Sequence, residues 1–120
     1  MPFATSCGWI TAQENSFVVP RFVEYASTKG ALETLTRAWS AEFGPAGVRV
    51  NAISPGVIRA PELTEHAAES LMRGTPAGGS GTPDAIAHAA VFLASDEAAF
   101  VHGTVMDVDG GRVHVAVIAG

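Results

Sequence analysis

Tyr25 and Lys29 are the two residues whose types and spacing could move a proton. Four positions correspond to about one helical turn, so on a helix both side chains would lie on one face, within reach of each other. A phenol titrates near pH ~10, and a neighbouring cation favours the phenolate and lowers the pKa of the phenol. The pair could therefore act as a general acid and base. A solvated surface pair has the same spacing, and the surrounding elements must decide between the two interpretations.

A helix over residues 24–43 would position this pair. Apolar residues recur in it at helical spacing, and Gly44 followed by Pro45 predicts where it ends. We expect most of the apolar stripe to pack in the core of the domain. The stripe consists of Leu32, Leu35, Ala38, Trp39 and Phe43.

Two strands and a second long helix follow. Residues 48–53 and 104–108 have the composition of buried strands, and a Ser-Pro-Gly run at 54–56 ends the first of them. Thr82 is the expected N-cap of the second helix, which ends near Ser95.

The remaining segments are harder to interpret. Residues 1–24 show no clean period and read as irregular, with room for one short strand. Residues 57–81 form a long loop that contains a short helix around 63–72, and such loops often serve as lids. An apolar tail over residues 113–118 could add a strand.

The alternation of helices and strands predicts an α/β fold, a parallel sheet with crossover helices. In such sheets ligands bind beyond the carboxyl ends of the strands. The Ser-Pro-Gly run at residues 54–56 lies at one such end, and the start of the Tyr25 helix would lie beside another. The expected crevice and the candidate acid–base pair therefore meet.

Composition excludes several classes of function. The chain has 120 residues, enough for one small domain, with 48% hydrophobic and 16% charged residues. A net charge of −5 without a Lys/Arg cluster argues against nucleic acid, and no apolar run is long enough for a membrane span. No signal peptide is expected, because the N-terminus lacks a basic patch followed by an apolar stretch. The single cysteine fits a reducing compartment such as the cytoplasm. No metal site is expected, because the four histidines lack ligand spacing; they are His66, His88, His102 and His114.

The ordered motifs resemble the C-terminal half of the short-chain dehydrogenase/reductase family. The resemblance covers residues 25–111 and begins with Y-x-x-x-K at Tyr25 to Lys29. It continues through Val-Arg-Val-Asn-Ala-Ile-Ser-Pro-Gly at 48–56, Gly-Thr-Pro-Asp at 81–84, Phe-Leu-Ala-Ser-Asp at 92–96 and Val-Asp-Gly-Gly at 108–111. We therefore expect residues 25–120 to form part of a Rossmann-like domain without the N-terminal cofactor-binding strands, preceded by the poorly readable segment 1–24.

The resemblance implies hydride transfer between NAD or NADP and a small carbonyl or alcohol substrate. Tyr25 would be the general acid or base, and Lys29 would lower its pKa and hydrogen-bond the nicotinamide ribose. Pro55, Gly56 and Val57 would pass close to the nicotinamide. Residues 60–81 would form the substrate loop, and the Tyr25–Phe43 helix would pair with a second copy in a homo-oligomer, with Trp39 at the interface.

The sequence departs from the family pattern at several places. The phosphate loop T-G-x-x-x-G-x-G and the Asn-Ala-Gly motif do not occur in these 120 residues. The family's catalytic Ser has no clear equivalent: Ser16, Thr11 and Ser6 are the available hydroxyls, and the position stays open. Ala60 stands where the family commonly has a Thr that touches the cofactor.

Two hypotheses of different classes follow. The chain is an NAD(P)-dependent oxidoreductase whose missing half comes from another chain or a longer protein. Alternatively, it is an inactive fragment, or an interaction module that pairs through the Tyr25–Phe43 helix. Nothing in the sequence selects NAD over NADP or identifies the substrate.

Overall fold

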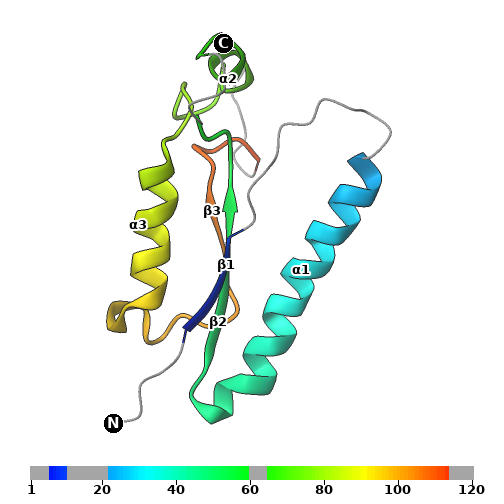
Figure 1. The fold of residues 1–120 in the computed structure, drawn as a ribbon, viewed down its shortest axis with the longest axis vertical. Helices are drawn as coiled ribbons and strands as arrows, with labels where there is room; N and C mark the ends of the chain where they lie inside the picture. Colours follow the sequence, from blue (N-terminus) through cyan, green and yellow to red (C-terminus); the bar gives the residue numbers. More distant parts are fainter. Residues whose placement is uncertain (1–5, 11–21, 60–64, 114–120) are drawn as a thin grey trace.

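A computed structural model describes residues 6–10, 22–59 and 65–113, which form a parallel sheet between two long helices (Figure 1). In chain order its elements are β1 (Ser6–Ile10), α1 (Phe22–Phe43), β2 (Arg49–Pro55), α2 (Glu65–Leu71), α3 (Pro83–Ala94) and β3 (Val105–Val108). Two 3-10 turns, η2 (Gly44–Ala46) and η3 (Asp96–Ala98), follow α1 and α3. The predicted α/β class, the helices and both expected strands are confirmed, and the short strand that residues 1–24 allowed is β1.

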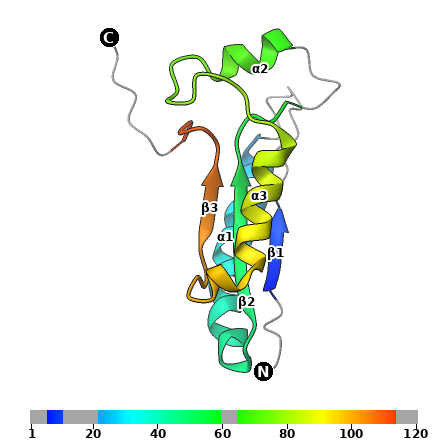
Figure 2. The same ribbon diagram turned by 90° about the vertical axis from the view of Figure 1, so that its left-hand side faces the viewer.

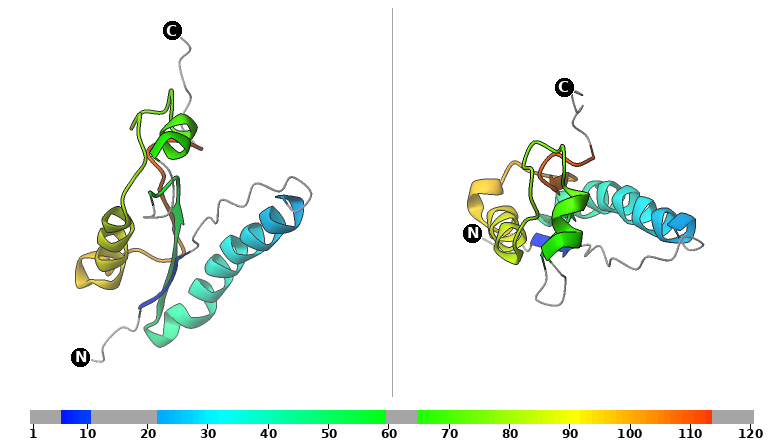
Figure 3. Two further views of the ribbon diagram at one scale, coloured as in Figure 1. Left: turned by 45° about the horizontal axis from the view of Figure 1, so that its top comes forward. Right: turned by 90° about the horizontal axis from the view of Figure 1, so that it is seen from above.

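The sheet order is β1-β2-β3, with β2 at the centre. Both pairings are parallel: Ile10 lies opposite Ile53 and Pro55 lies opposite Val108. The carboxyl ends of the strands therefore meet at one edge of the sheet, and α2 lies beyond that edge (Figure 3).

The two long helices cover opposite faces of the sheet, as Figure 2 shows with α3 in front and α1 behind. Both crossovers step in the same direction, from β1 to β2 and from β2 to β3. Two such steps with helices on opposite faces have opposite hands. The β1–α1–β2 crossover is right-handed, and the connection through α3 is the uncommon left-handed kind.

Because a helix covers each face, β2 is buried along residues 49–53. Ile53 packs against Ile86 and Leu93 of α3 in the main hydrophobic cluster. A second cluster at the carboxyl edge joins Val57 to Ala68 and Met72. The first cluster holds α3 on the sheet, and the second holds α2 at the edge where a ligand would bind.

The predicted core stripe of α1 is wrong. The most buried described side chains of this helix are Thr36 at 0% and Ser40 at 9% exposure, whereas Leu35 is 41% and Phe43 42% exposed. Small side chains let the helix approach the sheet closely, and the buried Thr36 hydroxyl is satisfied because it donates to the Leu32 carbonyl at 2.8 Å. The apolar residues of α1 thus lie partly on its outer side.

The helix ends differ in detail from the prediction. Residues 44–46 continue α1 as the 3-10 turn, and the left-handed residue is Gly47 (φ 85°), whose amide donates to the Gly44 carbonyl at 2.8 Å. Thr82 occupies the N-cap position of α3, yet its hydroxyl makes no capping hydrogen bond. Pro83 begins the helix as expected. None of the helices among the described residues has the length and apolarity to cross a membrane.

Candidate active site

The first turns of α1 carry the candidate acid–base pair. Tyr25 and Lys29 both belong to this helix, as the Y-x-x-x-K spacing predicts. The side chain of Tyr25 lies outside the described part of the structure. Lys29 is half-buried and lines a cavity between α1 and the carboxyl ends of β2 and β3.

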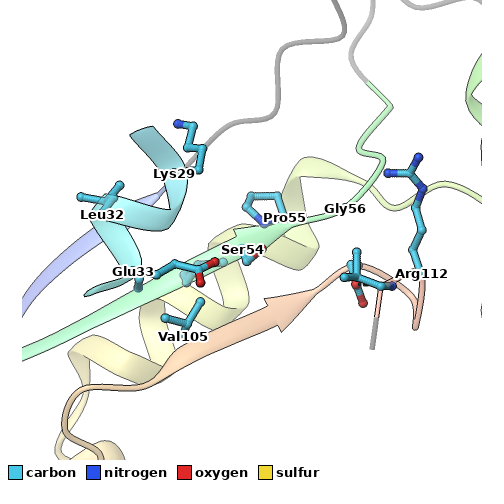
Figure 4. A pocket seen from close by; sticks show the side chains of 12 residues that line it. Lys29, Leu32, Glu33, Ser54, Pro55, Gly56, Val105 and Arg112 are labelled. Carbon is cyan, nitrogen blue, oxygen red and sulfur yellow. Dashed lines mark hydrogen bonds between the residues drawn. The ribbon is translucent and has the colours of Figure 1, made fainter. Parts of the chain in front are cut away.

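This cavity brings together residues that are distant in sequence. Figure 4 shows Lys29 and Glu33 of α1 beside Ser54 and Pro55 of β2, with Arg112 on the far side of the cavity. Gly56 also lines it. The structure therefore places Lys29 next to Pro55 and Gly56, three of the residues for which the sequence suggested a role in one site.

Val57 lies elsewhere. It is buried at 5% exposure against Ala68 and Met72, and it lines a second cavity of about 290 Å³ together with residues of the segment 72–81. The side chains of Pro55 and Val57 thus serve different cavities, and that of Val57 packs against α2.

Three charged residues of the first cavity were missed by sequence reasoning. Glu33 is one helical turn after Lys29, a spacing that could have drawn attention to it. Asp109 and Arg112 follow β3, and Asp109 belongs to the Val-Asp-Gly-Gly motif without a role having been assigned to it. These residues give the cavity charges of both signs.

Asp109 lies against Gly56. The Gly56 amide donates to the Val108 carbonyl at 3.0 Å, and a Cβ at Gly56 would come within 2.5 Å of the Asp109 Cα. Only glycine fits at position 56, because such a distance is far inside van der Waals contact. The neighbour that requires this glycine is Asp109 of the same chain.

One carboxylate joins the two ends of residues 69–80, which belong to the segment 65–81 that the sequence predicts to be a lid and that is called the lid segment, or lid, below. Glu69 of α2 accepts hydrogen bonds from the Ser80 hydroxyl at 2.7 Å and from the Ser80 amide at 3.3 Å. The hydroxyl contact first, and then the amide contact, holds the pKa of the Glu69 carboxyl below its ordinary value, because both favour the charged form. This contact closes the loop between residues 69 and 80.

The other residues that the sequence proposed for the site are not among the described residues that line the cavity beside Lys29. Ser6 begins β1 and pairs with Arg49, at the amino edge of the sheet, so it lies far from Pro55 along the strands. Thr11, Ser16 and Ala60 lie outside the described residues. Across residues 6–10, 22–59 and 65–113, no cluster of His, Cys, Asp and Glu could hold a metal ion.

Comparison with known proteins gives consistent matches. The model of a family described as enoyl-(acyl carrier protein) reductase matches residues 7–112. The chain is 38% identical over 97 residues to the 3-oxoacyl-(acyl-carrier-protein) reductase of Thermotoga maritima, covering 78% of this chain and 39% of that protein. It is 40% identical over 97 residues to 3beta-hydroxysteroid dehydrogenase 1 of Eggerthella lenta, covering 77% of this chain and 37% of that protein.

A solved structure described as a short chain dehydrogenase/reductase family protein superposes with a TM-score of 0.73 and 44% identity. The match covers 92% of this chain and 46% of that one. The chain thus spans less than half the length of each of these relatives.

Proposed function

The chain belongs to the short-chain dehydrogenase/reductase family, and on this premise we propose that it supplies the proton-transfer side of an NAD(P)-dependent oxidoreductase site. One observation carries the proposal. Lys29 of α1, Pro55 of β2 and Gly56, which follows β2, line one cavity at the carboxyl edge of a parallel sheet, the place where α/β folds bind ligands.

Tyr25 is the proposed general acid in carbonyl reduction and the general base in alcohol oxidation. It lies one helical turn before Lys29 on α1, a spacing that puts both residues on one face of the helix. The Lys29 ammonium favours the phenolate and brings the pKa of Tyr25 toward neutrality, where proton transfer is efficient.

The described residues fit one end of a dinucleotide. The cavity of about 170 Å³ lies below the ~300–1,000 Å³ of ordinary ligand pockets, so it could take a ring or a sugar and not a whole cofactor. Lys29 offers three donors for ribose hydroxyls, and Pro55 and Gly56 provide a backbone wall. NAD or NADP would supply the hydride donor or acceptor.

The phosphate end of the cofactor needs a glycine-rich loop at a helix N-terminus, and no such motif occurs in these 120 residues. The proposal therefore assigns that role to a further part of a longer protein or to another chain. The substrate is a small carbonyl or alcohol compound held under residues 65–81. We place the protein in the cytoplasm, where its single cysteine would stay reduced.

A non-enzymatic function is the second candidate, and the outer side of α1 favours it. Leu35 and Phe43 are large apolar residues that expose about two fifths of their surface, at 41% and 42%. Such side chains fit a helix that pairs with a second copy of the chain. In this alternative the chain is an interaction module or an inactive fragment.

Binding of NADH and NADPH, followed by the fluorescence of the reduced nicotinamide, separates the two candidates. For the enzyme we expect binding that Lys29→Met weakens and that Arg37→Met, on an exposed position of the same helix, leaves unchanged. Absence of binding together with absence of turnover across a panel of ketones would contradict the enzymatic proposal for this chain by itself. A monodisperse monomer that melts cooperatively and binds cofactor would contradict the interaction module.

A further inference from the structure

The turn after β3, residues 109–111, contacts both parts of the proposed site. On one side it meets Gly56: a Cβ there would lie 2.5 Å from the Asp109 Cα and 2.7 Å from its Cβ. The Gly56 amide also donates to the Val108 carbonyl at 3.0 Å. The backbone of residue 56 therefore cannot move toward β3 without moving the turn.

The carboxylate of Asp109 holds the turn in shape. Its Oδ1 accepts a hydrogen bond from the Gly111 amide at 2.9 Å, and its Oδ2 accepts one from the Val113 amide at 3.1 Å. Both oxygens are thus committed to the backbone that follows. Gly110 and Gly111 have φ values of 66° and 80°, a conformation that glycine adopts without strain.

On its other side the turn supports the lid. A Cβ on Gly110 would lie 2.7 Å from the Ala77 Cβ and 2.9 Å from the Met72 Cε. The Ala77 amide donates to the Gly110 carbonyl at 3.1 Å. A Cβ on Gly111 would lie 2.7 Å from the Pro76 Cγ. The lid residues 72–77 consequently rest on the two glycines.

From these contacts we infer that Asp109 is a positioning residue, which sets the spacing between the Gly56 backbone and the lid through the turn that it clamps. Asp109 lines both cavities, the one beside Lys29 and the one beside Val57. The meaning of this spacing for catalysis rests on the proposed function, in which Gly56 faces the cofactor and the lid covers the substrate. Loss of the clamp would then loosen both walls of the site together.

Hydrogen exchange of the 120-residue chain, measured residue by residue by NMR without cofactor, tests this coupling. In Asp109→Ala the amides of Gly111 and Val113 lose their acceptor and must exchange faster. The inference predicts that the Gly56 and Ala77 amides, whose acceptors are Val108 and Gly110, also exchange faster, by roughly tenfold.

Two sets of controls separate coupling from general loss of stability. The Ala52 and Gly103 amides, bonded to Thr104 and Val50 at the far end of the sheet, should keep their rates. Asp107→Asn removes an exposed carboxylate from the same strand and should change none of the four amides near the turn. Asp109→Asn keeps one acceptor oxygen, so it should restore part of the protection.

Faster exchange confined to Gly111 and Val113 would overturn the inference, because the clamp would then act only on its own turn. Asp109→Ala could also accelerate exchange of the reference amides, Ala52 and Gly103, which would indicate a general loss of stability. The milder variant Asp109→Asn then takes its place. The inference stands if exchange at Gly56 and Ala77 rises more than at the reference amides, and it falls if the rise is equal. The exchange experiment contains no cofactor, so a negative result would not count against the proposed function. Conversely, a failure of the chain to bind nucleotide would not count against the coupling of Gly56 and Ala77 through Asp109.

Discussion

The two ends of β2 are held in different ways. At its amino end, Arg49 and Asn51 are buried at 4% and 2% exposure, and their side chains bind backbone carbonyls of α3 and of the segment that follows it. At its carboxyl end, the backbone of Gly56 is held by its close approach to the Asp109 turn. Polar side chains fix the first end, and the absence of a side chain at residue 56 fixes the second.

This difference separates stability from the candidate chemistry. The Arg49 guanidinium donates to the carbonyls of Leu93 at 2.7 Å, Ala98 at 2.9 Å and Ser95 at 3.0 Å, and so it joins β2 to the end of α3 and to the η3 turn. Asn51 accepts from the Thr104 amide at 3.0 Å and donates to the Val101 carbonyl at 3.0 Å. The amino end is thus closed and fully bonded, whereas the carboxyl end carries both cavities.

Replacement of Arg49 should have the largest effect on stability. Arg49→Met keeps much of the packing and removes three charge-assisted hydrogen bonds, two of them buried. We expect the free energy of unfolding to fall by about 3–5 kcal/mol in urea titrations. Arg37→Met, on the exposed side of α1, is the matched control and should change it by less than about 0.5 kcal/mol. Equal effects of the two variants would contradict the structural role of the amino end.

Gly56→Ala should lower the free energy of unfolding by less than Arg49→Met does, and it acts at the carboxyl end of β2. The new Cβ would overlap the Asp109 Cα, and overpacking of this kind costs about 1–3 kcal/mol. Gly30→Ala is the control: a Cβ at Gly30 meets nothing within 4 Å and α1 should gain about 0.5–1 kcal/mol. In thermal melting, the melting temperature should fall in Gly56→Ala and rise in Gly30→Ala. Stabilisation by both substitutions would show that residue 56 has room and that the close approach is not real.

Protonation of Glu69 should have the smallest effect, confined to the lid. The hydrogen bonds from Ser80 lower the pKa of this carboxyl in the folded state. Its contribution is therefore complete above the unfolded pKa of ~4.3 and is lost as the pH falls through the lower folded value. In an NMR titration, Ser80→Ala should raise the midpoint of Glu69, because the largest stabilising contact is removed. An unchanged midpoint would show that the contact between α2 and residue 80 is absent in solution.

The sequence predicted where the helices and strands lie better than it predicted which side of each helix is buried. Residues 48–53 and 104–108 are apolar enough to identify both strands, and the spacing of Tyr25 and Lys29 placed them on one helix correctly. The buried face of α1 was missed because Thr36 and Ser40 pack where larger apolar residues were expected. A helix that packs close to a sheet needs small side chains at the contact, and the hydropathy pattern does not reveal this need.

Asp109 illustrates a second limit. The motif at residues 108–111 was visible in the sequence, but the role of Asp109 depends on Gly56, 53 positions earlier in the chain. Glycine at position 56 suggested close approach of something, and only the fold shows that the partner is the backbone of the β3 turn. Contacts between the ends of neighbouring parallel strands are set by register, which the sequence does not state.

Titration of the single tyrosine measures the central claim most directly. The chain contains one Tyr, so the ultraviolet absorption of the phenolate reports Tyr25 alone, with no cofactor and no substrate present. The account predicts an apparent pKa for Tyr25 clearly below the ordinary ~10, and its return toward that value in Lys29→Met, while Arg37→Met leaves it unchanged. A phenol that titrates near pH ~10 in the chain and in both variants would contradict the account, because Lys29 would then not act on Tyr25.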